Sequence, residues 1–158
     1  MDTGITGKNV PAAMAIAQVV QAVATYYLLN KFIGSFGFKW TLTIGAAAWF
    51  LLYLVYIISK PRALIVISQS LHGLAYVLFI IAGQIFANIT SPPEIRSSVQ
   101  ALVFAATTGV GLFLGTQFAG VVMDIFRKED RFNWRAIFSV PAVIMFASII
   151  ALVMLFKG

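Results

Sequence analysis

Neutral polar side chains recur on single faces of two long apolar segments. The first set consists of Gln18, Gln21 and Thr25. The second set has the same helical spacing and consists of Gln69, His72, Tyr76 and Gln84. Residues three or four positions apart share one side of a helix, and exposing an amide to lipid is costly. The two stripes therefore predict the walls of a cavity that binds a polar solute. The alternative is that these amides only bond neighbouring helices.

His72 is the only histidine in the chain. Imidazole is the side chain whose ordinary titration range includes neutral pH, so His72 is a candidate for proton coupling. A buried histidine can also serve as a hydrogen-bond donor to a partner helix. Both interpretations remain open at this point.

Five apolar stretches contain these residues, at about 11–30, 40–58, 64–87, 98–123 and 136–156. None of them contains Asp, Glu, Lys or Arg, and each reaches the ~20 residues that a spanning helix needs. Backbone groups in hydrocarbon must pair within the segment, so each stretch is expected to be a helix. The sequence predicts an all-α integral membrane protein with five transmembrane helices, multi-pass in the plasma or inner membrane. Short connections make neighbouring helices antiparallel.

Composition excludes several classes of function. The chain of 158 residues is 61% hydrophobic and 10% charged, which leaves no room for a soluble domain, so residues 1–158 are expected to form a single membrane bundle. There is no cysteine, no pair of acids and no metal-ligand cluster. We therefore expect no enzyme activity, no catalytic residue, no metal and no cofactor. The net charge of +6 is spread over separate segments, which favours the lipid bilayer over nucleic acid as a partner.

The fourth stretch is rich in glycine. Gly111 and Gly115 are one helical turn apart and form a small-residue face that predicts close helix packing. Glycine-rich helices also suit sliding motions in transporters. Thr107, Thr108 and Gln117 are expected to hydrogen-bond across that contact.

Basic residues are distributed unequally between the two sides of the predicted bundle. Seven lie on the side of the N-terminus and four on the other, which places the N-terminus in the cytoplasm by the positive-inside rule. The seven are Lys8, Lys60, Arg62, Arg127, Lys128, Arg131 and Arg135. The four are Lys31, Lys39, Arg96 and Lys157.

Several short motifs resemble the C-terminal half of nucleoside:proton symporters of the major facilitator superfamily. In order along the chain they are Gly37-Phe38-Lys39-Trp40, Leu71-His72-Gly73-x-x-Tyr76, Gly83-Gln84-Ile85, Pro93-Glu94-Ile95-Arg96-Ser97-Ser98-x-Gln100 and Asn133-Trp134-Arg135. The similarity covers nearly the whole chain with the right spacing. It implies that the five stretches correspond to the eighth to twelfth helices of a twelve-helix fold, a partial C-terminal bundle.

The same resemblance assigns roles to individual residues. Gln18 matches a substrate-contacting glutamine and Tyr76 a substrate-contacting tyrosine, and Gln21 stands where the family has a glutamate at the substrate. Val77 stands where the family has an aspartate. Both acids would contact the sugar or take part in proton coupling, so a subgroup with altered substrate or coupling fits the chain as well as a strict nucleoside carrier. The family's cytoplasmic chain ends also imply the orientation opposite to the one that the basic residues indicate.

Two functions follow. The first is the C-terminal part of a symporter that moves nucleosides or similar small polar solutes by alternating access, and that needs an N-terminal transporter half as its partner. The second is a non-transporting five-helix membrane scaffold or assembly subunit. Unrelated sequence upstream of the gene and a defined homo-oligomer would favour the second function.

Overall fold

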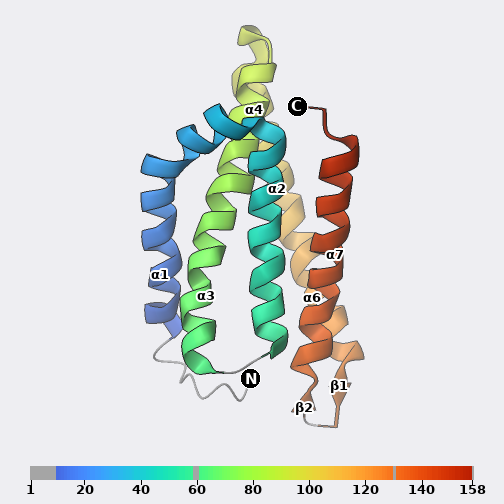
Figure 1. The fold of residues 1–158 in the computed structure, drawn as a ribbon. Coiled ribbons are helices and arrows are strands. Elements are labelled where there is room, and N and C mark those ends of the chain that lie inside the picture. The colour runs from blue at the N-terminus through green and yellow to red at the C-terminus, as the bar shows by residue number, and fades with distance from the viewer. Residues whose placement is uncertain (1–9, 59–60, 130, 158) are drawn as a thin grey trace.

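The computed structural model describes residues 10–58, 61–129 and 131–157. Nearly all of them are helical, in a bundle of long and roughly parallel rods (Figure 1). In chain order the elements are α1 (Val10–Val23), η2 (Ala24–Leu28), α2 (Leu29–Ile58), α3 (Arg62–Ala75), η3 (Tyr76–Ile81), α4 (Ala82–Thr90), η4 (Pro93–Ile95), α5 (Arg96–Phe104), η5 (Ala105–Gly111), α6 (Leu112–Ile125), β1 (Arg127–Lys128), β2 (Arg131–Phe132) and α7 (Trp134–Leu155).

Among the described residues, four helices are long and apolar enough to cross a membrane, not the five that the sequence predicts. They are Val10–Ile58, Arg62–Thr90, Pro93–Ile125 and Trp134–Leu155. The difference arises because the expected connection at residues 31–39 is itself helical and joins the first two stretches. At about 1.5 Å per residue, the 49-residue helix Val10–Ile58 is far longer than the ~30 Å of a bilayer's hydrocarbon.

Gly37 allows this first helix to turn back. It has φ 70° and ψ 174°, which lies outside the helical region and is accessible essentially to glycine alone. As a result α1 and most of α2 run in opposite directions, with α3 packed between them (Figure 1).

We expect Gly37→Ala to destabilise the chain by about 1–3 kcal/mol, because alanine is strained at this φ and ψ. The matched control is Gly34→Ala, three residues earlier in the same helix, where an added β-carbon meets nothing within 4 Å. Denaturant midpoints of both variants in one detergent measure the difference. Equal midpoints would contradict the role given to Gly37.

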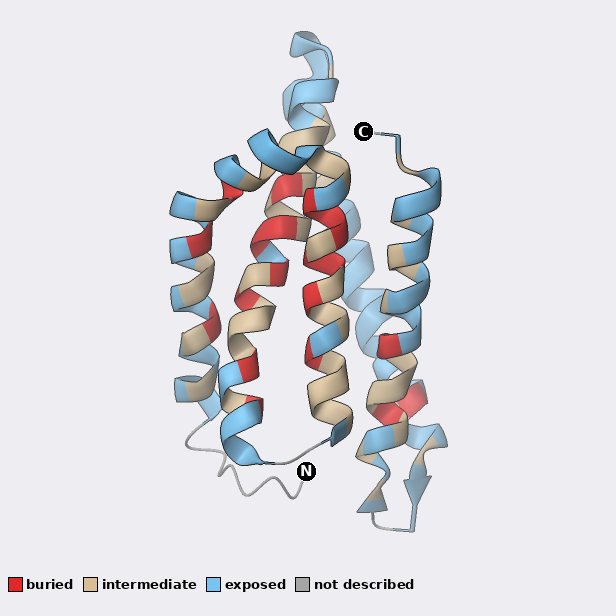
Figure 2. Ribbon diagram, viewed as in Figure 1, coloured by how far each residue is buried: buried red, intermediate tan, exposed pale blue. Residues whose placement is uncertain are grey.

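The core lies where α2 packs against η2, α3, η3 and α4 (Figure 2). Its buried members are Ala24, Leu29, Leu42, Val77, Leu78 and Ala82. The buried hydroxyls of Thr41, Thr43 and Ser68 donate to the backbone carbonyls of Gly37, Lys39 and Ile65, each in the same helix. The core therefore holds polar atoms without leaving them unpaired, as a lipid environment demands.

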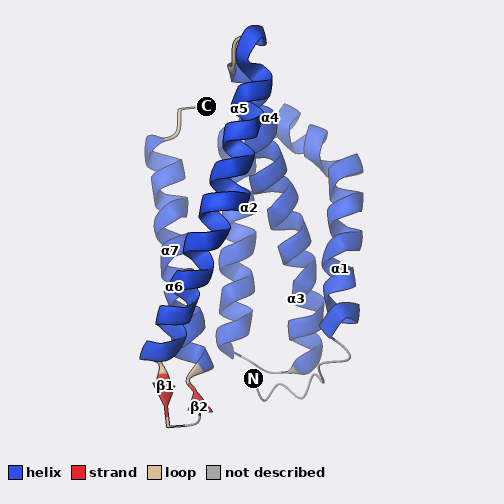
Figure 3. Cartoon of the chain, turned by 180° about the vertical axis from the view of Figure 1, so that it is seen from behind, coloured by secondary structure: helices blue, strands red, loops and turns tan. Residues whose placement is uncertain are grey.

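The helix formed by α5, η5 and α6 stands apart from this core. Val122 is its only buried residue. In Figure 3, which views the chain from behind, this helix crosses in front of α2. Near its start it is tied to the bundle by Gln100, whose side-chain Nε2 donates to the Gln84 carbonyl oxygen at 2.9 Å. After this helix, β1 and β2 pair in antiparallel register.

Candidate functional site

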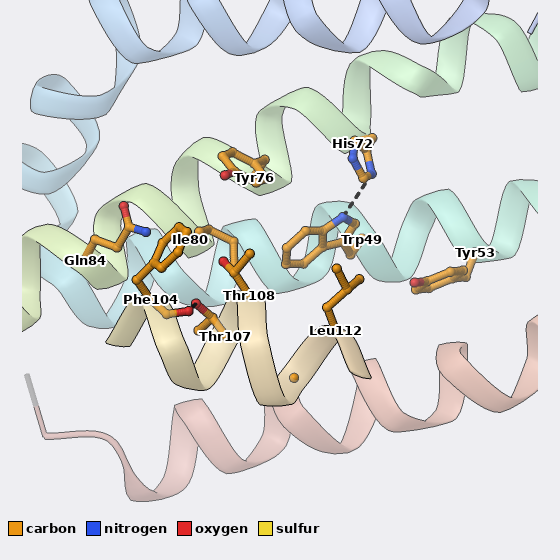
Figure 4. A pocket seen from close by; sticks show the side chains of 11 residues that line it. Trp49, Tyr53, His72, Tyr76, Ile80, Gln84, Phe104, Thr107, Thr108 and Leu112 are labelled. Carbon is orange, nitrogen blue, oxygen red and sulfur yellow. Dashed lines mark hydrogen bonds between the residues drawn. The ribbon is translucent and has the colours of Figure 1, made fainter. Parts of the chain in front are cut away.

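A cavity of about 690 Å³ separates this helix from α2 and α3. That volume lies within the range of known small-molecule pockets, ~300–1,000 Å³. The side chains that line it come from three helices and are drawn in Figure 4. They are Trp49 and Tyr53 from α2, His72, Tyr76, Ile80 and Gln84 from the α3–η3–α4 helix, and Phe104, Thr107, Thr108, Gly111 and Leu112 from the third helix.

Two π-helical segments, η3 and η5, contribute to the lining. η3 supplies Tyr76 and Ile80, and η5 supplies Thr107, Thr108 and Gly111. A π-helical turn changes the direction of the side chains after it, and such turns occur often at functional sites. Both segments are therefore local departures from α-helix at the same place in space.

The lining has hydrogen-bonding groups but no ionised ones. Tyr76, Gln84 and the two threonines provide hydroxyls and an amide, and none of the lining residues is Asp, Glu, Lys or Arg. Trp49 and Phe104 add flat apolar surfaces. Such a cavity can hold a neutral, flat and polar molecule by stacking and hydrogen bonds, but it offers no acid–base pair for a covalent reaction.

Trp49 and His72 meet across the cavity wall. The indole Nε1 donates a hydrogen bond to His72 Nδ1 at 3.4 Å, and the two rings lie edge to face at an angle of 60° (Figure 4). The indole also packs edge-on against Phe79, with centroids 5.6 Å apart. His72 is half-buried and its ring is held between α2 and α3.

The structure brings together only part of the predicted site. His72, Tyr76 and Gln84 line the cavity as expected for one helical face. Gln69 does not, because its side-chain Nε2 donates to Tyr56 Oη at 2.8 Å and to the Ile65 carbonyl oxygen at 3.2 Å. That amide bonds a neighbouring helix, which is the alternative interpretation of the stripe.

The polar face of α1 lies outside this cavity. Gln18 is exposed, and Gln21 is half-buried where α1 crosses α3. Thr25 donates to the carbonyl of Gln21 within its own helix. Neither Gln18 nor Gln21 is among the residues that line this cavity with Tyr76.

Within the described part of the chain, close helix packing lies at two other glycines. Among the described residues, an added β-carbon at Gly115 meets nothing within 4 Å, and one at Gly111 meets only Ala106 of the same helix. By contrast, a β-carbon at Gly45 would lie 2.7 Å from Phe79 N, and one at Gly73 would lie 3.0 Å from Gln21 N and closer still to Ala17 O. Gly73 is thus the position at which α3 meets α1. Gly45 is the position at which α2 meets η3.

Sequence reasoning missed Trp49 and Phe104 and assigned Thr107 and Thr108 to packing. A signal for Trp49 existed, because an indole N–H in the middle of an apolar span needs an acceptor. His72 was an available acceptor on another helix. Phe104 carries no such signal, since an apolar ring in an apolar helix is typical of a lipid-facing or core position.

Comparison with known proteins gives a consistent result. The family model described as "Nucleoside H+ symporter" matches residues 2–158. Nucleoside permease NupG of Escherichia coli (strain K12) is 26% identical over 136 residues, covering 82% of this chain and 32% of the permease. Xanthosine permease of the same organism is 27% identical over 133 residues, covering 82% of this chain and 32% of that protein. The chain thus spans about a third of the length of these curated relatives.

Solved structures agree with these relatives. A crystal structure of nucleoside transporter NupG (D323A mutant) superposes with a TM-score of 0.84 at 25% identity, over 92% of this chain and 37% of that chain. A second crystal structure of nucleoside transporter NupG covers the whole of this chain and 40% of that chain, with a TM-score of 0.86 at 23% identity. The arrangement of helices is therefore that of part of a known transporter fold.

Proposed function

Because the chain belongs to the nucleoside H+ symporter family, we propose that it is the C-terminal part of a secondary transporter that moves nucleosides or similar small polar solutes by alternating access. One observation carries the proposal beyond family membership. Within a membrane bundle, the chain builds a cavity of ligand size whose lining is aromatic and neutral-polar. A nucleoside has a flat base and hydroxyl groups, and stacking surfaces and hydrogen-bonding side chains suit both.

The cavity is incomplete within this chain. Phe104, Thr107 and Thr108 line it and are exposed, and nearly the whole helix that carries them is unburied. In transporters of this kind the substrate site lies between two bundles. We propose that helices of an N-terminal half close the cavity, and that the exposed glycine face with Gly111 and Gly115 packs against them.

The two acid positions suggested by resemblance have different surroundings. Val77 is fully buried in the apolar core with Leu78 and Ala82. A carboxylate there would lie in the core rather than in the cavity, so the valine leaves the cavity's polar groups unchanged. Gln21 is half-buried at the α1–α3 crossing. We propose that altered coupling in this chain depends on Gln21.

Reconstitution tests the proposal directly. Vesicles that hold only this chain should not take up radiolabelled nucleoside, because half of the site is missing. Vesicles that also hold an N-terminal portion of nucleoside permease NupG, lacking the region that the chain matches, should bind and transport it. We refer to this pair as the co-reconstituted transporter. Uptake by the chain alone would contradict the incomplete-site proposal. Absence of binding by a correctly assembled pair, together with a defined homo-oligomer of the chain, would favour the scaffold function.

Tyr76 offers a conservative test of the cavity assignment. We expect Tyr76→Phe to weaken nucleoside binding about fivefold, because the ring and its packing are kept and one hydroxyl hydrogen bond is lost. Equilibrium binding to the co-reconstituted transporter measures the change. Tyr26→Phe is the matched control, since Tyr26 is 77% exposed and does not line the cavity. Unchanged affinity in Tyr76→Phe would remove Tyr76 from the binding site.

Gln18→Ala tests α1 separately. Gln18 does not line the cavity within this chain. A loss of affinity similar to that of Tyr76→Phe would mean that the closed site extends to α1, as the family resemblance implies. An unchanged affinity would limit the site to α2, α3, η3 and η5.

A further inference from the structure

The Trp49–His72 hydrogen bond determines which ring nitrogen of His72 carries a proton. The indole N–H can only donate, so the nitrogen that it contacts must accept. That nitrogen is Nδ1, with Trp49 Nε1 at 3.4 Å. A neutral imidazole has one N–H, so its proton must then lie on Nε2.

The surroundings of His72 contain no group that would reverse this arrangement. The titratable side chains that line the cavity with it are Tyr53 from α2 and Tyr76 from η3. The described segments α1 and η5 contain no Asp, Glu, Lys, Arg, His or Tyr. No carboxylate in the lining is therefore present to accept a proton from Nδ1 or to pair with an imidazolium.

Nε2 of His72 is open to the cavity. It has no hydrogen-bond partner among the described residues, and among those residues no buried side-chain nitrogen or oxygen lacks a partner. Nε2 is consequently not buried. Since His72 lines the cavity, its Nε2–H is available to a molecule inside it (Figure 4).

We propose that Trp49 is a positioning residue that holds His72 as a neutral imidazole with its proton on Nε2. His72 is then a fixed hydrogen-bond donor to an acceptor oxygen or ring nitrogen of the solute, and not the group that carries the transported proton. The donor role rests on the proposed function of the cavity. The tautomer is a property of the chain by itself and can be measured without any solute.

The composition of the chain makes the tautomer of His72 directly measurable by NMR. His72 is the only histidine, so a chain labelled with ¹⁵N-histidine gives signals from one imidazole. Protonated and unprotonated ring nitrogens differ widely in ¹⁵N chemical shift. In lipid bilayers at neutral pH we expect a protonated Nε2 and an unprotonated Nδ1. A protonated Nδ1 in the wild-type chain, as the other tautomer or as imidazolium, would overturn the proposal even if no variant folds.

Trp49→Phe removes the indole N–H and keeps an aromatic ring. We expect the ratio of the Nε2–H to the Nδ1–H tautomer to fall about fivefold, the factor that a hydrogen bond of ordinary net strength supplies. Trp134→Phe is the matched control, because Trp134 packs against Phe132 and Phe138 rather than His72. A folded Trp49→Phe chain with the wild-type ratio would overturn the positioning role.

The donor role has its own measurement. Adding uridine to the co-reconstituted transporter should shift the Nε2 resonance while the proton stays on Nε2. An unchanged resonance under conditions where uridine binds would overturn the donor role and leave the tautomer intact. Absence of uridine binding would instead count against the proposed function, so the two failures are distinguishable.

Discussion

Replacing Gly73 with alanine should destabilise the chain by about 3 kcal/mol, more than the same change at Gly109 or Gly115. A β-carbon at this position would lie 3.0 Å from both Ala17 C and Gln21 N, and closer still to Ala17 O. These neighbours are backbone atoms, so no side-chain rotation can relieve the clash and α1 must move away from α3. Gly45→Ala should act in the same way, because its β-carbon would lie 2.8 Å from Leu78 C.

Two glycines on another helix provide the controls. At Gly109 and Gly115 an added β-carbon meets nothing within 4 Å, so alanine should be neutral or stabilise the helix by up to ~1 kcal/mol. Unfolding midpoints of all four variants in the same detergent give the comparison. If Gly115→Ala destabilised the isolated chain as strongly as Gly73→Ala, the close helix contact would lie at α6 and not between α1 and α3.

Replacing Thr108 with tryptophan should abolish nucleoside binding by the co-reconstituted transporter. Thr108 projects into the cavity from η5 (Figure 4), and an indole at that place would occupy the space that a nucleoside needs. Forcing a ligand into an overpacked site costs about 3 kcal/mol, which corresponds to a loss of affinity of about 100-fold. Equilibrium binding of a radiolabelled nucleoside measures this loss.

Thr116→Trp is the matched control. Thr116 is exposed on α6, does not line the cavity and donates to the Phe113 carbonyl in its own helix. The same bulk added there should leave nucleoside affinity within about twofold of wild type. Equal binding by both tryptophan variants would show that nucleosides bind elsewhere, and equal loss would point to disturbed assembly.

The apolar helices could be predicted because the bilayer imposes a simple rule on sequence: about 20 apolar residues whose backbone groups pair within the segment. The number of separate helices could not be predicted. Residues 31–39 contain Lys31, Gly34, Ser35 and Gly37, a composition typical of a loop. In the structure they stay helical, and only Gly37 leaves the helical region. The backbone conformation of a single residue, Gly37, allows the chain to reverse direction. The composition of residues 31–39 does not indicate which residue has that conformation.

The packing glycines show a second limit. Spacing identified Gly111 and Gly115, yet neither meets another helix among the described residues. Gly73 and Gly45 do meet another helix, and nothing in their local sequence distinguishes them. What makes a glycine necessary is the backbone that lies opposite it, and that partner comes from a distant part of the chain.

The cavity was partly predictable for a related reason. His72, Tyr76 and Gln84 are polar in an apolar helix, their spacing predicts one helical face, and all three line the same cavity. Gln69 belongs to the same stripe but satisfies its amide on Tyr56. Which members of a polar stripe face a cavity depends on where neighbouring side chains offer partners, so spacing alone cannot separate them.

The absence of ionised groups from the cavity wall has an electrical consequence. A membrane potential does work of about 2.3 kcal/mol for each elementary charge moved through 100 mV. None of the residues that line this cavity carries a formal charge. Under the proposed alternating access, the potential would therefore do no work on the formal charge of this wall or of a neutral solute bound to it. Any voltage dependence of transport would then come from charges outside this lining. The magnitude of that voltage dependence would measure how much of this charge moves through the membrane potential.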